Sequence, residues 1–446
     1  MASGSSLPKF RVAICGGGIG GLVLAVTIGK YSKVPVDLYE ARPEITTAGA
    51  GIAIWRRTME VMHELGLYGD LEKVVSRAPD SSRGPCFRRA DLVDGGHEWF
   101  HQTFKYDQSN LHRRDMVDIL KKHLPSTCAI HLSKRLTTYT QTQAGGLQLH
   151  FADGTSVAAD ILVGADGVKS PTRKAMFDWL VGHKPDAIDK RKLADYVNPV
   201  WTGRLVYRAL VPLEVLQRCS PGNPSAKEMI VACGRGKHVV TYPVARGTLV
   251  NVAAYIYDPQ KAGTHFEGHW VADVSEEEVQ RAFENFEPYI RQLLECCKKP
   301  SRWALHIVNE LPLWTSGNVA LIGDACHAMT PFFGAGAGQA IEDAFVLGRL
   351  LAHDLTTPQN LPEALRVYQE IRLPSANYVA RESYKTGFMY DFLAPGYFDG
   401  LDRTNEKEEL ERLHQAIITQ WEWQMKEGFI EQWAEAEKLL KKSSGC

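Results

Sequence analysis

The segment that most constrains the fold lies near the N-terminus, where a glycine-rich turn joins two short apolar runs. The run over 10–15 is rich in strand-forming side chains, a helical pattern covers 22–30, and a second apolar run over 34–39 ends at Glu40. The glycines between the first run and the helix are spaced G-x-G-x-x-G and are Gly16, Gly18 and Gly21. This order predicts a strand, a tight turn, a helix and a second strand that ends on an acidic side chain.

A unit of this kind is suited to binding a dinucleotide. Gly16 allows the tight turn, Gly18 lets the backbone approach a pyrophosphate, and Gly21 lets the helix pack close to its strand. The helix N-terminus attracts phosphates because its N–H groups are unpaired and its dipole is positive there. Glu40 can accept hydrogen bonds from both hydroxyls of an unphosphorylated ribose, which favours FAD or NAD(H) over NADP(H). The alternative is a glycine-rich turn without a ligand.

The composition fits a protein with more than one core and no strongly charged partner. A chain of 446 residues exceeds one ordinary hydrophobic core, so we expect two or three structural units. The 51 basic and 52 acidic residues give a net charge of −1, so there is no reason to expect nucleic acid or an anionic membrane as a partner.

The cysteine spacing and the lengths of the apolar runs indicate in which cellular compartment the protein is expected. Nine cysteines include no C-x-x-C pair and no zinc spacing, so we expect reduced thiols without a disulfide framework or a metal site. The N-terminus has no apolar leader, and no apolar run of about eighteen residues follows it. These features predict a cytoplasmic protein without a transmembrane segment.

Two further segments resemble parts of a ligand site. A small-residue loop over 48–51, which ends in Gly51, would let a flat ring or a phosphate chain pass close to the backbone. A buried-strand pattern over 161–163 leads to Asp166, which is followed by a glycine. Doubly wound sheets place ligand-binding groups at this end of a strand.

A second glycine-rich loop lies far along the chain. An apolar strand pattern over 319–322 leads to Asp324, and a helix is expected from about Gln339. The glycines between them are Gly334, Gly336 and Gly338. Two such loops far apart in sequence indicate one long ligand. We interpret His327, which lies between them, as structural.

The amphipathic pattern after residue 112 predicts a helix that begins with Arg113 and Arg114. Positive charges at a helix N-terminus oppose the helix dipole, so they suggest an anionic partner. A solvated charge pair is the alternative, and the sequence does not decide which of the two arginines would contact a ligand.

From about residue 200 the pattern changes to four β-rich runs in series, which predicts an antiparallel sheet. Side chains that alternate along a strand share a face of the sheet. Those that share a face here are Arg204, Val206 and Arg208 on one strand and His238, Val240 and Tyr242 on another.

Three motifs in order give the chain a family resemblance: GGGIGG with Glu40, then GADGVKSPTR, then GDACHAMTPFFGAGAGQAIEDA. Lesser matches are GAGI over 49–52 and HRRDM over 112–116. With these residues the chain resembles the single-component, or group A, FAD-dependent aromatic hydroxylases, which are similar to salicylate hydroxylase. Fungal phenol hydroxylases, including dearomatising ones, look similar at YRALV and TYPVA.

The resemblance implies an α/β fold. Its parts would be a Rossmann-like FAD-binding domain of the glutathione-reductase type, as in para-hydroxybenzoate-hydroxylase-like proteins, a β-sheet substrate domain and a helical C-terminal region. We expect the FAD-binding domain over 8–80, 107–180 and 301–360. The substrate domain is expected over 81–106 and 181–300, and the helical region over 361–446.

The resemblance also implies cofactors and site residues. FAD would be bound tightly but non-covalently, and NAD(P)H would be a transient electron donor. The pyrophosphate would lie at Gly16, Gly18 and Gly21 and the adenosine ribose at Glu40. The other expected cofactor contacts are Gly51, Arg113, Asp166, Asp324, Gly336 and Ala337.

Two departures from the family pattern stand beside these matches. Arg56 and Arg57 occupy the place of a frequent Pro-Asn pair, where a helix beside the flavin would begin. The loop GAGAG replaces a more typical G-Q-G-A, so the usual glutamine near the ring is missing.

The resemblance implies that reduced flavin and O₂ form a C4a-hydroperoxide that hydroxylates a phenol. We expect Arg208 to favour the phenolate and Tyr242 to donate to the same oxygen, as catalytic groups. The substrates that the resemblance implies are substituted hydroxybenzoates, prenylated ones included, which would lose CO₂ or their aromaticity. A salt-bridged arginine and a core tyrosine are the alternative for this pair.

Two other functions remain open from the sequence. One is an epoxidase or reductase that acts on an isoprenoid, which an apolar cavity without an inward Arg208 would favour. The other is a non-catalytic flavin redox sensor. The partners expected are the phenolic substrate, O₂ and NAD(P)H, with no nucleic acid, and an oligomer is not excluded.

Overall fold

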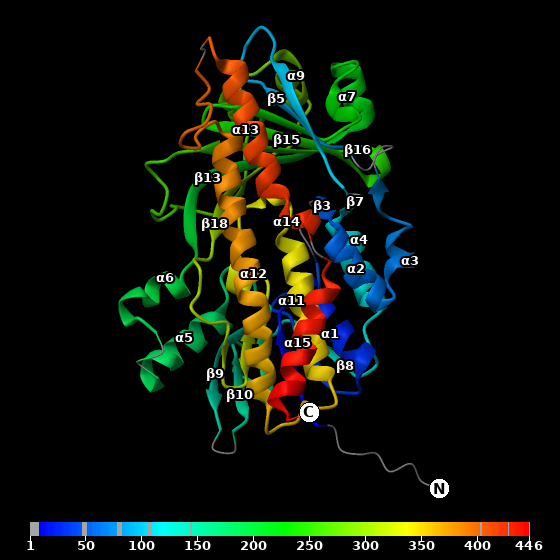
Figure 1. The fold of residues 1–446 in the computed structure, drawn as a ribbon, viewed down its shortest axis with the longest axis vertical. Coiled ribbons are helices and arrows are strands. Elements are labelled where there is room, and N and C mark those ends of the chain that lie inside the picture. Colours follow the sequence, from blue (N-terminus) through cyan, green and yellow to red (C-terminus); the bar gives the residue numbers. More distant parts are fainter. Residues whose placement is uncertain are drawn as a thin grey trace.

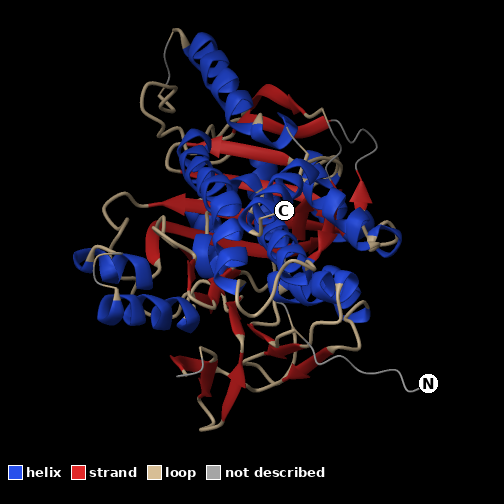
Figure 2. Ribbon diagram, turned by 60° about the horizontal axis from the view of Figure 1, so that its bottom comes forward, coloured by secondary structure: helices blue, strands red, loops and turns tan. Residues whose placement is uncertain are grey.

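The computed structural model describes residues 9–46, 51–77, 83–105, 109–142, 145–184, 186, 188–401, 404–426 and 428–445. Most of the predicted small-residue loop over 48–51 lies outside these residues, and only Gly51 is described. The two ends of the molecule in Figure 1 are built around two large sheets, and helices lie over the strands in Figure 2. The mixed α/β fold expected from the sequence is confirmed.

The first sheet has six strands in the order β19-β20-β12-β1-β2-β8, and only β19 is antiparallel to its neighbour. Its strands are β1 (Val12–Cys15), β2 (Val36–Tyr39), β8 (Cys128–His131), β12 (Ile161–Gly164), β19 (Thr315–Ser316) and β20 (Val319–Leu321). Central strands of a parallel sheet are covered on both faces, which explains the unbroken apolar runs of β1 and β12.

Helices on this sheet pack closely where small residues meet. The helix α1 (Ile19–Tyr31) lies against α11 (Gly336–Ala352), and a Cβ on Gly348 would come within 2.7 Å of the Thr27 side chain. The other helices of this end are α2 (Arg56–Leu65), α3 (Tyr68–Leu71), α4 (Arg113–Lys122), α5 (Pro171–His183), α6 (Leu193–Val197) and α10 (Asp324–His327). Helix α11 begins at Gly336, so the expected start at Gln339 is wrong by three residues, because the glycines themselves form the first turn.

Two small sheets border the first one. They contain β9 (Leu136–Gln141), β10 (Leu147–Phe151) and β11 (Ser156–Ala159), and β3 (Gly51–Ile54), β7 (Ser109–His112) and β4 (Ser76–Arg77). Strand β7 leads directly into α4, so β3 and the arginines at the start of α4 lie side by side.

The second sheet has eight strands in the order β17-β18-β13-β16-β15-β14-β5-β6. Its strands are β5 (Arg83–Arg89), β6 (His97–Thr103), β13 (Val200–Pro212), β14 (Ile230–Gly234), β15 (Lys237–Val244), β16 (Leu249–Tyr257), β17 (Val271–Asp273) and β18 (Ser301–Ile307). All neighbours are antiparallel except β5 and β14. The helices α7 (Leu213–Cys219), α8 (Glu276–Ala282) and α9 (Pro288–Glu295) share an apolar core with one face of this sheet.

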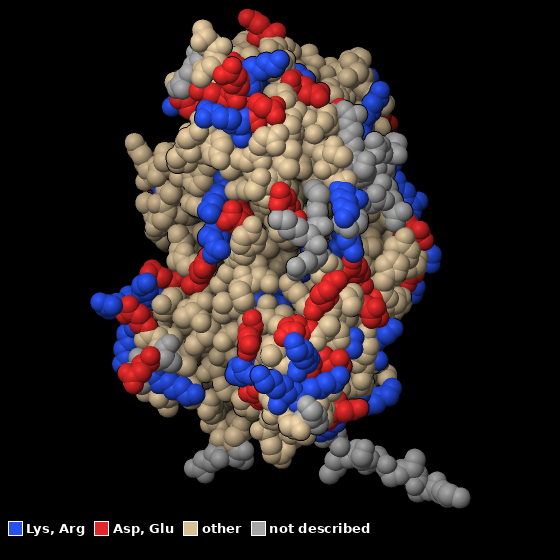
Figure 3. Space-filling model, viewed as in Figure 1, with Lys and Arg blue, Asp and Glu red and all other residues tan. Residues whose placement is uncertain are grey.

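Helices of the C-terminal region connect the two ends of the molecule. Helix α12 (Leu361–Tyr390) runs from the first sheet to the second, and α15 (Ile430–Ser443) packs beside α11 and α12 (Figure 1). Helix α13 (Glu406–Trp421) contacts β6 and is followed by α14 (Trp423–Lys426). On the face shown in Figure 3, acidic and basic side chains alternate, as the near-zero net charge suggests.

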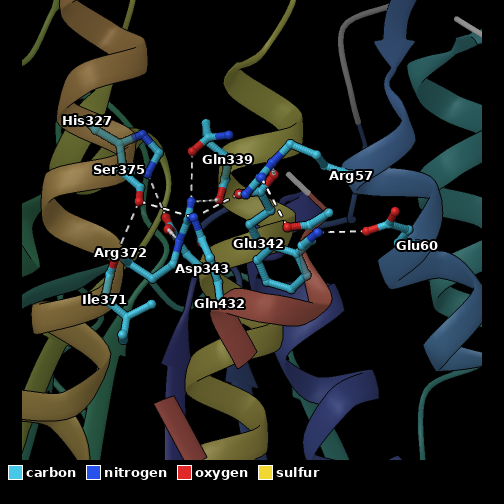
Figure 4. A network of polar contacts seen from close by, with 12 residues as sticks. Arg57, Glu60, His327, Gln339, Glu342, Asp343, Ile371, Arg372, Ser375 and Gln432 are labelled. Carbon is cyan, nitrogen blue, oxygen red and sulfur yellow. Dashed lines mark hydrogen bonds and ion pairs between the residues drawn. The ribbon is translucent and has the colours of Figure 1, made fainter. Parts of the chain in front are cut away.

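A buried ion network holds α11 to its neighbours (Figure 4). Arg57 on α2 donates to both oxygens of Glu342, at 2.9 and 3.0 Å. Arg372 on α12 donates to Glu342 at 2.8 Å and to Asp343 at 2.9 Å. His327 lies 2.6 Å from Asp343 within this network, which fits its interpretation as a structural residue.

The network depends on charge because its carboxylates are fully buried. Burial alone would raise the pKa of Glu342 and of Asp343, but the facing guanidinium groups and His327 outweigh burial and lower both values. Carboxyl groups with lowered pKa values stabilise the fold above the ordinary carboxyl pKa of about 4, and this stabilisation is lost as the pH falls through the folded values.

We expect Arg372→Leu to destabilise the fold by about 3–5 kcal/mol, because it leaves two buried carboxylates without their shared cation. Urea unfolding at neutral pH measures this loss. The matched control is Arg366→Leu on the same helix, whose partners Glu363 and Glu370 are on the surface; it should cost less than about 1 kcal/mol. Equal losses in the two variants would contradict a special role for the buried network.

Candidate active site

One cavity of about 680 Å³ extends from the carboxyl edge of the first sheet to the inner face of the second. Its lining includes every site residue expected from the sequence except Gly21. Residues of the second sheet and of the C-terminal helices complete the wall. The cavity therefore joins segments as far apart in sequence as Gly16 and Trp421.

The turn after β1 is shaped by close backbone contacts. Gly16 has a φ of +118°, and a Cβ there would lie 2.2 Å from the carbonyl oxygen of Ala165. A Cβ on Gly21 would lie 2.0 Å from the carbonyl oxygen of Gly16, so α1 packs directly on the turn. Gly18 has no heavy atom within 4 Å of its Cβ position, which leaves open space in front of the helix N-terminus. These three positions match the three expected glycine roles, which remain proposals for this chain.

Glu40 follows β2 and is held towards the same turn. Its carboxylate accepts hydrogen bonds from the backbone N–H groups of Gly17, at 2.8 Å, and Arg42, at 2.9 Å. Two backbone donors fix the orientation of the carboxylate at the cavity wall.

Asp166 follows β12 on the neighbouring strand. One of its carboxylate oxygens accepts from the backbone and the hydroxyl of Thr172, at 2.9 and 2.6 Å. The other oxygen has no hydrogen-bond partner within the described part of the chain. Desolvation raises the pKa of Asp166, although the nearby Ser170 hydroxyl and the hydrogen bonds from Thr172 act to lower it. A ligand hydroxyl would satisfy the remaining oxygen.

The second glycine-rich loop faces the same space. Asp324 is the first residue of α10 and lines the cavity, and Gly336 and Ala337 form the first turn of α11 there. The first turn of α11 contains no acidic residue, so its unpaired N–H groups are open to an electron-rich ligand atom. The start of α2 at Arg56 is kept despite the departure from the family pattern.

The structure distinguishes the two arginines at the start of α4. Arg113 lines the cavity. The side chain of Arg114 is 77% exposed and lies 3.7 Å from Asp118 on the same helix. Arg113 is therefore the one placed to contact a ligand.

The cofactor and substrate ends of the cavity meet at Gly51 and Tyr242. A Cβ on Gly51 would lie 2.9 Å from the Tyr242 hydroxyl oxygen. Strand β3, which begins at Gly51, thus contacts β15 of the second sheet through the side chain of Tyr242. Only a glycine at position 51 leaves room for this side chain.

Arg208 and Tyr242 lie together on the inner face of the second sheet. Burial raises the pKa of Tyr242, while the nearby Arg208 lowers it. The Arg208 guanidinium lies 5.5 Å from the ring centroid of Trp303. Among the described residues no carboxylate forms an ion pair with it, and its role at the site stays a prediction.

Arg204 shares its face with Arg208 but does not line the cavity. It is fully buried and forms an ion pair with Asp391 at the end of α12. Asp391 also lies 2.6 Å from Nδ1 of His238, whose pKa is lowered by burial. This cluster ties the second sheet to the C-terminal helices.

Several lining residues were missed from the sequence. Asn251 and Tyr255 on β16 line the cavity, and their two-residue alternation was visible. Tyr390 and Trp421 come from α12 and α13, and no local pattern separates them from ordinary core aromatics. Only the long-range packing of α13 reveals their position.

This fold and this site define a flavoprotein monooxygenase. A family model described as an FAD binding domain matches residues 9–201 and 269–383. Salicylate hydroxylase of Pseudomonas putida is 36% identical over 395 residues, which cover 87% of each chain. The 6-methylsalicylate 1-monooxygenase of Aspergillus terreus is 34% identical over 382 residues, covering 82% of this chain and 79% of that one.

Solved structures agree with these relatives. A salicylate hydroxylase in complex with its substrate has a TM-score of 0.82 at 29% identity and covers 97% of this chain and 98% of its own. Klebsiella pneumoniae HpxO with FAD and uric acid has a TM-score of 0.68 at 23% identity, covers 96% of both chains and shows the shared fold. The chain belongs to the salicylate-hydroxylase-like family of FAD-dependent aromatic monooxygenases.

FAD is the cofactor of this enzyme, and the cavity fits it. The open space at Gly18, the unpaired oxygen of Asp166 and the first turn of α11 are the features that a bound dinucleotide would use. Within the described ranges, no helix combines the length and apolarity needed to cross a membrane.

We expect Gly18→Ala and Gly21→Ala to separate cofactor binding from folding. The methyl group added in Gly18→Ala would enter open space, so the apoprotein should melt as the wild type does. The Kd for FAD should rise at least about tenfold, because that methyl group would stand in the proposed pyrophosphate position. The Gly21 methyl group would overlap a backbone oxygen and should also destabilise the apoprotein, by about 1–3 kcal/mol. Fluorescence titration with FAD and thermal melting measure both effects. A Gly18→Ala protein that binds FAD normally would contradict the pyrophosphate assignment.

The paired arginines of α4 provide a second test with an internal control. Arg113→Ala should weaken FAD binding by about ten- to hundredfold, the cost of a lost charge-assisted hydrogen bond. Arg114→Ala should change the Kd by less than about twofold, because its side chain points to solvent. Equilibrium dialysis of FAD against both apoproteins measures the difference, and the reverse ranking would overturn the assignment.

Proposed function

We propose that this monooxygenase hydroxylates a phenol that binds as its anion between Arg208 and Tyr242. The observation that carries the proposal is Arg208 itself, which lines the cavity and has no carboxylate partner among the described residues. A partly buried guanidinium without a counter-ion is costly, and an anionic substrate would remove that cost. NAD(P)H and O₂ would be the other reactants.

Arg208 would lower the pKa of the substrate hydroxyl, because a nearby positive charge favours the phenolate. Tyr242 stays protonated near neutral pH, since burial raises its pKa. Its hydroxyl can therefore donate a hydrogen bond to the phenolate oxygen. The contact between Tyr242 and Gly51 supports a position for that oxygen beside the flavin end of the cavity.

FAD held at the expected contacts and reduced by NAD(P)H would activate O₂, by the expected C4a-hydroperoxide chemistry, so that one oxygen atom of O₂ goes to the ring and the other leaves as water. The protein orients the ring and makes it electron-rich by holding the phenolate. A carboxyl group on the attacked carbon would leave as CO₂, and an alkyl group there would leave the ring dearomatised. The name of one relative, 6-methylsalicylate 1-monooxygenase, places the attack at the carbon that carries the carboxyl group and supports the first outcome.

The inward position of Arg208 also weighs against the isoprenoid alternative. A neutral isoprenoid would leave the guanidinium unpaired and desolvated.

The proposed FAD contacts, residue by residue, are those expected from the sequence, with Arg113 chosen over Arg114 and Gly21 acting through the packing of α1.

We expect Arg208→Gln to retain FAD but to lose coupling. NAD(P)H oxidation should continue with peroxide as its main product, while the wild type incorporates oxygen into one phenol of a hydroxybenzoate, orcinol-type and prenylated-phenol panel. Coupling in the variant should recover as the pH rises towards the solution pKa of the phenol, about 10. Oxygen-isotope incorporation and released CO₂ measure the products.

Two variants serve as comparisons for Arg208→Gln. Tyr242→Phe should reduce coupling less, because it removes one neutral donor. Arg302→Gln on the adjacent strand β18 is the control, since Arg302 pairs with Glu278 instead of lining the cavity. Normal coupling in Arg208→Gln at neutral pH would overturn the proposal.

A further inference from the structure

Five aromatic side chains form one wall of the cavity, and we call them the aromatic chamber. They are Trp55, Phe332, Phe333, Tyr390 and Trp421. The Trp421 ring lies 5.2 Å from Trp55 and 5.0 Å from Phe333, both near edge-to-face. All five side chains are at least nine-tenths buried. The chamber is thus a preformed apolar surface.

The chamber is continuous with the Arg208 end of the cavity. Phe332 lies 5.3 Å from Tyr255 on the second sheet and 6.2 Å from Tyr390. Arg208 on β13 pairs with Ala253 on β16, so Tyr255, two residues further along β16, lies on the same face of the sheet and lines the same cavity. A ring held at Arg208 would therefore have aromatic surface beside it.

The indole donors of the chamber are already used within the protein. Nε1 of Trp55 donates to the carbonyl oxygen of Phe333 at 3.2 Å. Nε1 of Trp421 donates to the Tyr390 hydroxyl at 3.3 Å. The tryptophans thus offer a ligand their apolar faces and no free N–H group.

Charge is placed away from the chamber. Arg42 and Lys134 line the cavity beside Glu40. The backbone N–H of Arg42 donates to the Glu40 carboxylate, and the backbone N–H of Lys134 donates to the Glu40 carbonyl oxygen. Arg113 lies beside β3. Of the described lining residues, Arg208 is the cation on the second sheet. The five aromatic side chains therefore offer a ligand apolar surface, and the cation at this end of the cavity is Arg208.

The chamber depends on residues outside the segments that the family model matches. That model ends at residue 383, and Tyr390 and Trp421 follow it. Both are supplied by the C-terminal helices α12 and α13.

From these contacts we infer that the aromatic chamber is a subsite for a bulky apolar substituent, such as an alkyl, isoprenyl or aryl group, on the phenol whose oxygen Arg208 holds. This inference rests on the proposed function, because it takes the acidic group to be held at Arg208. Helix α13 then acts as the specificity element, with Trp421 as its contact to the substituent.

Binding of 3- and 4-alkylphenols to the FAD-loaded enzyme tests the subsite by calorimetry, without turnover. In one of the two series the Kd should tighten about three- to fourfold for each added CH₂ until the chamber is full. A carboxylate at the far end of the chain should weaken binding by at least about tenfold, because the chamber cannot pair a second charge.

Variants of α13 and α14 provide the control. Trp421→Ala should weaken binding of the best alkylphenol at least about tenfold and shift the optimum to longer chains, while Trp421→Phe shifts it less. Trp423→Ala is the matched control, since Trp423 packs on Phe333 without lining the cavity. It should leave the series unchanged, and thermal melting checks that all variants fold.

The outcomes separate this inference from the proposed function. If the Kd does not depend on chain length although phenols are hydroxylated, the subsite is wrong and the hydroxylase proposal stands. If long chains bind tightly but no phenol is hydroxylated, the subsite stands and the hydroxylase proposal fails. If Trp421→Ala and Trp423→Ala shift the series equally, the assignment of Trp421 is overturned.

Discussion

The close backbone contact at Gly16 is the constraint on which the rest of the structure depends. The turn after β1 lies against Ala165 at the end of β12, and α1 lies against the turn, with no room for a side chain at Gly16 or Gly21. These contacts align the carboxyl ends of β1, β2 and β12 at one edge, where Glu40 and Asp166 stand. A long ligand can lie along that edge because backbone, and not side chains, forms its floor.

The carboxyl edge of the first sheet becomes an enclosed site only through the helices α11 and α12, which come late in the chain. Arg372 on α12 holds α11 by its two acidic residues, so the first turn of α11 faces the cavity in a fixed position. The same helix carries Asp391 to the second sheet, where it meets Arg204 and His238. One helix thus connects the cofactor edge to the substrate sheet by buried charge at both places, and buried pairs are sensitive to the loss of either partner.

The sequence predicted those parts of the site that depend on local geometry. The glycine spacing, Glu40 and Asp166 are local to a strand and its turn, so one segment contains their whole signal. Arg113 could not be separated from Arg114, because only the direction in which α4 faces decides between them. Arg208 was found by two-residue alternation, while Asn251 and Tyr255 had the same signal and were not chosen. Trp421 had no usable signal, since its proposed role depends on contacts with Trp55 and Phe333, which lie 366 and 88 residues away in sequence.

The placement of charge in the cavity connects substrate choice with reactivity. The Arg208 guanidinium lies over the ring of Trp303. This cation–π contact contributes about 0.5–2 kcal/mol, which offsets only part of the cost of desolvating a guanidinium. When a substrate displaces the remaining water, a neutral ligand would increase that cost, whereas a phenolate would remove it. The anion is also the form of the ring that reacts with an electrophilic oxygen. The same electrostatic term would therefore select the substrate and activate it, while the aromatic wall, which contributes no charge, would decide only what the ring carries.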